Sequence, residues 1–105
     1  MATIDSPQTL AASAQAGGDP PAGLSGPLKA LWLTKADRWH EAHDVAQDLN
    51  SKMGDWIHAL LHLIEGDIGN SAYWYNRAGK SQPTTDQIDE EWHRITTAAL
   101  EAEAS

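Results

Sequence analysis

The segment from residue 55 to residue 80 constrains the fold of this chain most strongly. It reads DWIHALLHLIEGDIGNSAYWYNRAGK. At the spacing of an α-helix, the apolar side chains between Trp56 and Ile64 cover a wide arc and leave a narrow polar strip. A helix with so little polar surface is buried on most of its circumference. We therefore predict a deeply buried helix over residues 55–65.

A turn and a second helix follow this buried segment. Gly66 and Asp67 are turn residues, Asn70 is a favourable N-cap, and Gly79 stands where a C-cap glycine is expected. These signals predict a helix over residues 70–78. The two helices would form a hairpin.

Three further segments show helical spacing. The first covers residues 25–36 and can be capped by Ser25, and the second covers residues 38–49. A last helix starts near Thr84, where a capping box with Gln87 is available. No segment alternates as a strand would. We predict an all-α fold: a small bundle of antiparallel hairpins with four main helices over residues 25–78, the last helix after them, and an optional helix after Ser6 at the N-terminus.

The glycines and prolines divide the chain into two parts. Five of them lie between residues 17 and 23, where they interrupt any regular element. We predict a flexible N-terminal segment over residues 1–24 and a single all-α domain over residues 25–103. A domain of this size buries only about 60% of its unfolded surface, so pairing with a second copy would stabilise it.

Composition excludes several classes of protein. The chain of 105 residues has no cysteine, which excludes disulfides, thiolate metal sites and a cysteine nucleophile. Its net charge is −8, and only seven Lys and Arg are scattered along it, which argues against nucleic acid and anionic membrane as partners. It shows neither the pattern of a signal peptide nor a long apolar run. We therefore expect an acidic cytoplasmic protein.

Half of the chain carries a repeat-like pattern. It consists of an early Trp, a small residue, Gly-Asp at the turn, paired aromatics, an Ala and a Pro. The positions are Trp56, Ala59, Gly66, Asp67, Trp74, Tyr75, Ala78 and Pro83. This pattern resembles tetratricopeptide (TPR) and Sel1-type repeats. The resemblance implies TPR-like helical hairpins and a role in protein–protein interaction.

Longer strings extend the resemblance. They are ALW (30–32), WHEAHDVAQDL (39–49), WIHALLHLIEGD (56–67) and NSAYWYNRAGK (70–80). Together they are similar to a group of small, uncharacterised, mostly bacterial proteins. This likeness supports the fold and implies no activity.

Histidines supply the candidate metal or ligand site. His58 and His62 are one helical turn apart, and Glu65 lies on the same strip. Two imidazoles at this spacing can bind one metal ion, which a nearby carboxylate can also bind. His43 could add a ligand from the neighbouring helix. Such a set suits Zn²⁺ or another divalent transition ion.

A structural role is the alternative for these histidines. They could hydrogen-bond to neighbouring helices, for example to Tyr73, Asn76 or Asp67. Residues 59–61 between them are Ala-Leu-Leu, so the general base of a zinc protease motif is absent. A hydrolase using His62 as base would lack a recognisable nucleophile, so we expect no catalytic residues and favour a protein that is not an enzyme.

The aromatic run at residues 73–75 bears on partners. Trp74 and Tyr75 lie on a packing face, whereas Tyr73 points nearer Arg77 and could form an interaction surface. We expect a protein partner or self-association as a homodimer. The leading hypothesis is therefore a non-enzymatic interaction module, and the alternative is a metal- or ligand-binding protein using His43, His58, His62 and Glu65.

Overall fold

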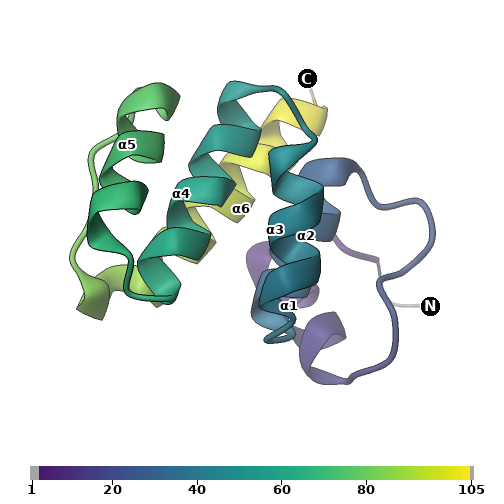
Figure 1. Cartoon of the computed structure of the whole chain (residues 1–105). Coiled ribbons are helices and arrows are strands. Elements are labelled where there is room, and N and C mark those ends of the chain that lie inside the picture. Colours follow the sequence, from purple (N-terminus) through teal and green to yellow (C-terminus); the bar gives the residue numbers. More distant parts are fainter. Residues whose placement is uncertain (1–2, 105) are drawn as a thin grey trace.

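The computed structural model describes residues 3–104, and in this range the chain is all-helical (Figure 1). It forms six α-helices and one short 3-10 helix, η1. In chain order these are α1 (Pro7–Gln15), α2 (Gly26–Lys35), α3 (Trp39–Gln47), α4 (Lys52–Ile64), α5 (Ile68–Ala78), η1 (Thr85–Gln87) and α6 (Ile88–Ala104). The predicted fold class, a small all-α bundle of antiparallel hairpins, is confirmed.

Helix α4 is the centre of the bundle. It contacts α2, α3, α5 and α6, and every residue from Trp56 to Leu63 is buried. Helices α2 and α3 form one hairpin, α4 and α5 form the other, and α6 crosses behind α4 (Figure 1). Close approach within the second hairpin depends on Ser71, whose hydroxyl donates to the carbonyl of Ala59 at 2.9 Å. The prediction of a deeply buried helix is confirmed.

The start of each helix in this second hairpin differs from the prediction. Helix α4 begins three residues early because the Ser51 hydroxyl accepts the backbone N–H of Gly54, which makes Ser51 the N-cap. Helix α5 begins at Ile68 because the Asp67 side chain accepts the N–H of Asn70. The predicted N-cap role of Asn70 is therefore wrong, and its side chain is left to face α4.

Other predicted caps are confirmed. The Ser25 side chain caps α2, and Thr84 and Gln87 form the capping box ahead of α6. Gly79 ends α5 in the left-handed conformation, with φ of 72°, which only glycine adopts without strain.

The N-terminal segment contributes to the core. Ser6 caps α1, which buries Leu10 and Ala14. The indole of Trp32 donates to the Ser13 hydroxyl at 3.0 Å and ties α2 to this helix. The optional N-terminal helix is thus present, and the predicted flexibility of residues 1–24 stays a prediction.

A buried carboxylate joins three helices. Glu91 on α6 is 2% exposed, and its Oε2 accepts hydrogen bonds from the Trp56 indole and the Tyr75 hydroxyl, both at 2.9 Å. Its Oε1 accepts from Arg94 at 2.5 Å. Burial, and then the Glu91 charge, raise the pKa of Tyr75, so this phenol remains a donor. Glu91 therefore connects α4, α5 and α6, and both of its carboxylate oxygens accept hydrogen bonds.

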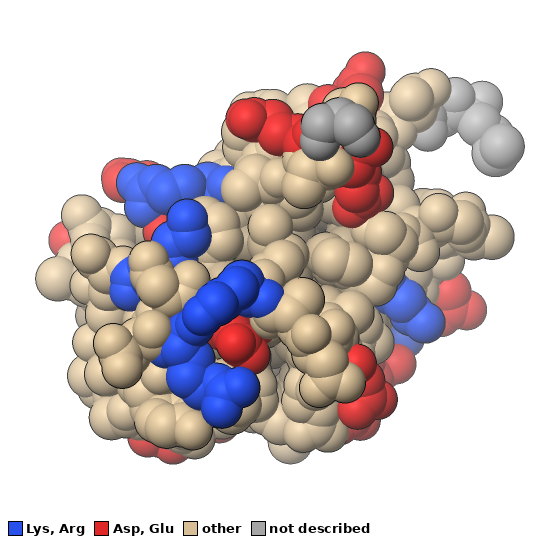
Figure 2. All heavy atoms as spheres, turned by 90° about the horizontal axis from the view of Figure 1, so that it is seen from above, with Lys and Arg blue, Asp and Glu red and all other residues tan. Residues whose placement is uncertain are grey.

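Charge is unevenly spread over the surface. Seen from above, many of the Lys and Arg side chains gather on one part of this face, and Asp and Glu lie among them and along its edges (Figure 2). This face contains the start of α4 and the end of α5 (Figure 1). Within residues 3–104, no helix combines the length and the apolar character needed to cross a membrane.

Candidate metal centre

Three imidazoles meet between α3 and α4. His43 comes from α3, and His58 and His62 come from α4; one nitrogen from each lies within 4.8 Å of the others. The ring centroids are 4.5 Å apart for His43 and His58, and 4.8 Å apart for His58 and His62. The structure therefore brings together the three histidines that the sequence singled out. We call them the His cluster.

Helix spacing and packing explain why the His cluster forms. His58 and His62 are one turn apart on α4, so both face α3. They are only 5% and 7% exposed, whereas His43 is partly exposed at the edge of α3. The cluster thus lies at the boundary between core and surface, where an ion can enter.

Two tryptophans stack against the cluster. Trp39 stacks on His43 with centroids 4.9 Å apart, and Trp74 stacks on His58 with centroids 4.0 Å apart. The Trp39 indole donates to the carbonyl of Leu61 at 2.7 Å, which fixes this ring against α4. These two stacked indoles limit how far His43 and His58 can turn away from each other.

Hydrogen bonds are distributed unequally within the cluster. His62 Nδ1 lies 2.7 Å from Glu65 Oε1, and His62 Nε2 lies 3.4 Å from the Asn70 amide nitrogen. Since a carboxylate only accepts, Nδ1 donates to Glu65, which in the neutral tautomer leaves the lone pair on Nε2. His43 and His58 have no hydrogen-bond partner among residues 3–104. None of the expected bonds to Tyr73, Asn76 or Asp67 forms in this part of the chain.

The surroundings keep two of the imidazoles neutral. Burial, followed by the charge that a neighbouring imidazole would carry, lowers the pKa of His43. The same causes lower the pKa of His58 to about 4. At neutral pH both rings therefore present lone pairs, as metal ligands must.

Carboxylates lie beside the cluster. Glu65 and Asp67 form a second group with His62, with donor atoms within 4.8 Å, and both carboxylates are exposed. Glu65 is thus placed next to His62 and outside the group made by the three rings. Asp67 had been predicted as a turn residue, which it also is.

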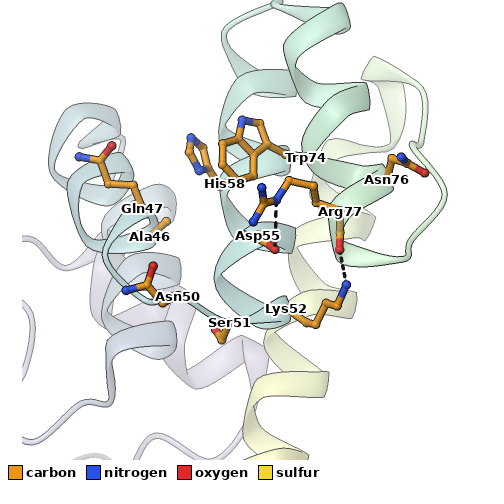
Figure 3. A pocket seen from close by; sticks show the side chains of 10 residues that line it. All are labelled: Ala46, Gln47, Asn50, Ser51, Lys52, Asp55, His58, Trp74, Asn76 and Arg77. Carbon is orange, nitrogen blue, oxygen red and sulfur yellow. Dashed lines mark hydrogen bonds and ion pairs between the residues drawn. The ribbon is translucent and has the colours of Figure 1, made fainter.

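A groove adjoins the His cluster (Figure 3). Its volume is about 640 Å³, and it lies between α3 on one side and α4 with α5 on the other. His58 and Trp74 stand side by side in it, and Lys52, Asp55 and Arg77 lie further along. Lys52 and Asp55 carried no site signal in the sequence, since single charges on helix ends are common. Figure 3 shows that both come from the start of α4, where Arg77 of α5 lies beside them.

The two predicted interaction residues, Tyr73 and Arg77, are exposed on α5, and Arg77 also lines the groove. Tyr73 is 54% exposed, and its hydroxyl accepts a long hydrogen bond of 3.4 Å from Arg77. Trp56 and Tyr75, predicted as structural, are buried. Trp74 is only partly buried and lines the groove, so it belongs to the site as well as to the packing.

The His cluster can hold a divalent transition ion. Zn²⁺ bound tetrahedrally keeps its ligand atoms about 3.4 Å apart, so small rotations that draw the rings inward would complete the site. Three imidazole nitrogens leave a fourth tetrahedral position open for water or another ligand. Comparison of the chain with protein-family profiles, with curated proteins and with solved structures gives no match.

Proposed function

We propose that this protein binds a divalent transition metal ion through His43, His58 and His62, with Zn²⁺ as the expected ion. One observation carries the proposal: three imidazoles converge within 4.8 Å, and two of them have no hydrogen-bond partner in the described chain. Within residues 3–104 no buried side-chain nitrogen or oxygen lacks a partner, so the ring nitrogens of His43 and His58 that make no hydrogen bond are open to solvent. They are therefore accessible to an ion, and their convergence with a nitrogen of His62 favours a metal ligand set.

Glu65 supports the proposal as a partner of a ligand. Metal-binding histidines commonly donate their second N–H to a carboxylate, which fixes the ring and makes the other nitrogen a better ligand. The 2.7 Å contact between His62 Nδ1 and Glu65 has this form. The lone pair on His62 Nε2, now 3.4 Å from Asn70, would turn to the metal.

Metal analysis tests the proposal directly. Protein made without a histidine tag should bind close to one equivalent of Zn²⁺, and the ion should stabilise the fold by about 2.7 kcal/mol when its concentration is a hundred times Kd. His43→Phe and His58→Phe should each weaken binding at least roughly a hundredfold, because a three-nitrogen site loses a ligand. Calorimetric titration measures both effects.

Matched controls separate the cluster from histidine content in general. His40 is exposed on α3, and His93 bonds to the backbone of α6 away from the cluster. His40→Ala and His93→Ala should bind Zn²⁺ as the unaltered protein does. Equal binding by His58→Phe, or no bound Zn²⁺ in the unaltered protein, would sink the proposal.

A second candidate function is a non-enzymatic protein-interaction module with TPR-like hairpins. The observation that favours it is apolar exposure around the second hairpin, where Ile64, Ile68 and Tyr73 are 38%, 46% and 54% exposed. Large exposed aromatics are enriched where proteins associate. The expected partner is a second copy, as a homodimer, or another protein.

Light scattering tests this candidate. A homodimer should appear in the unaltered protein, and the double variant Ile68→Ser, Tyr73→Ser should be monomeric with the same helical content. A strict monomer from which no partner is recovered would count against it. Its failure would leave the metal proposal untouched, because no residue of the His cluster is altered.

A further inference from the structure

We propose that the groove beside the His cluster binds a small anion, a carboxylate or phosphate group, that completes the coordination of the metal. This inference rests on the proposed metal site and names the class of ligand it takes. His58 belongs both to the cluster and to the groove wall, so the two sites are continuous (Figure 3). A ligand in the groove can therefore reach the ion.

Positive groups gather in the groove of an otherwise acidic protein. Lys52 and Arg77 line it together with one acid, Asp55, in a chain with a net charge of −8. Figure 2 shows the corresponding gathering of cations on the upper face. The groove is also lined by Ser51 and Lys52 at the start of α4, where the helix dipole presents its positive end.

Both cations keep hydrogen-bond donors for a ligand. Lys52 donates one hydrogen bond to the backbone carbonyl of Arg77, at 2.6 Å. Arg77 has a loose ion pair with Asp55 at 3.7 Å and the long bond to Tyr73. An ammonium has three donors and a guanidinium five, so an anion could bind without breaking either contact.

Metal makes the groove selective for anions. Without metal, the two cations and Asp55 leave it a net charge of +1. A divalent ion in the cluster raises the local charge to about +3 and offers an open coordination position. Trp74 forms an apolar wall, and the volume of about 640 Å³ falls in the range of small-ligand sites. We therefore expect anion binding to depend on the metal.

Cobalt substitution provides the test, since Co²⁺ in a histidine site absorbs visible light and reports its own coordination. Co²⁺-loaded full-length protein is titrated with acetate and, separately, with inorganic phosphate at constant ionic strength. Each effective anion should change the cobalt spectrum and shift the amide signals of Lys52 and Arg77. The anion that binds more tightly identifies the ligand as a carboxylate or a phosphate.

Variants assign the effect to the groove. Lys52→Gln and Arg77→Gln should each weaken anion binding roughly fivefold and leave Co²⁺ affinity unchanged. Lys29, exposed on α2 outside the groove, gives the matched control Lys29→Gln, which should change neither. Circular dichroism checks that each variant is folded.

The outcomes separate this inference from the metal proposal. Absence of bound Co²⁺ overturns both. Normal Co²⁺ binding with no response to either anion overturns the groove proposal alone, as does a response of equal affinity in Lys52→Gln and Arg77→Gln. Anion binding of equal strength without metal would also overturn it, because the ion would then have no part in the site.

Discussion

Helix α4 contributes to two polar clusters that differ in how completely they are hydrogen-bonded. In the Glu91 cluster, both carboxylate oxygens are used, by Trp56, Tyr75 and Arg94. In the His cluster, only His62 has hydrogen-bond partners in the described chain. Burial differs as well: Glu91 is 2% exposed, whereas His43 is partly exposed and His58 lines the groove.

The difference indicates different roles. A buried group whose hydrogen bonds are all made holds the elements around it together. An imidazole that makes no hydrogen bond keeps its lone pair available for a ligand. The Glu91 cluster is thus expected to stabilise the fold, and the His cluster to serve binding. Four experiments test whether the two clusters have these different roles.

The largest effect is expected on removing the carboxylate. Glu91→Ala leaves two buried donors unpaired and should lower the free energy of unfolding by about 3–5 kcal/mol. Glu91→Gln retains an acceptor and should cost less. Glu90→Ala, on the exposed neighbour, should change stability by no more than about 0.5 kcal/mol. Urea unfolding measures all three; a loss below about 1 kcal/mol in Glu91→Ala would contradict the bracing role.

The second largest effect is expected from acid, which should lower stability through His58. The pKa of His58 is about 4 in the folded protein and 6.5 when unperturbed. Below pH 6.5, His58 therefore binds a proton in the unfolded chain but not in the folded protein. The free energy of unfolding consequently falls as the pH drops toward 4. The loss attributable to His58 in metal-free protein should reach about 3 kcal/mol by pH 4.

The variant His58→Phe isolates this contribution. Its unfolding free energy should depend less steeply on pH between 6.5 and 4 than that of the unaltered protein, with other groups contributing equally to both. Parallel curves would mean that His58 titrates normally and is not held neutral by its surroundings.

Glu65 should tune the metal site. Glu65→Gln keeps a hydrogen bond to His62 Nδ1 and removes the charge, so Zn²⁺ affinity should fall about tenfold. The fold should be unaffected, because Glu65 is exposed. Glu90→Gln is the control of equal charge change. A loss above a thousandfold would instead identify Glu65 as a direct ligand.

The smallest effect is expected for His58→Phe at pH 7 without metal. His58 has no hydrogen bond to lose within residues 3–104, and a phenyl ring preserves the stacking on Trp74. Stability should change by no more than about 1 kcal/mol. A loss as large as that of Glu91→Ala would mean that both clusters brace the fold.

Much of the fold could be read from local signals. The capping side chains Ser25 and Thr84, the terminating Gly79 and the buried arc of residues 56–63 are properties of short segments, and each was confirmed; Ile64, predicted in the same arc, is exposed. The starts of α4 and α5 were missed because Ser51 and Asp67 competed with other plausible caps nearby. Local propensity does not decide between such neighbours.

The Glu91 cluster and the His cluster, in contrast, depend mainly on contacts between helices. Glu91 lies at helical spacing between Ile88 and Ile95, on the apolar face of α6, and this position was the available signal for a buried carboxylate. The one-turn spacing of Trp39 and His43 was the signal for stacking. Neither spacing reveals the partner on another helix.

The sequence by itself determined the helices, their buried faces and the pairing of His58 with His62, because these follow from the period of one helix. Only the tertiary structure decided that His43 completes the cluster, that Glu91 is fully paired, and that Lys52 and Arg77 share a groove with His58. Those contacts join residues from different helices. Their distances depend on how the helices pack, which no local pattern specifies.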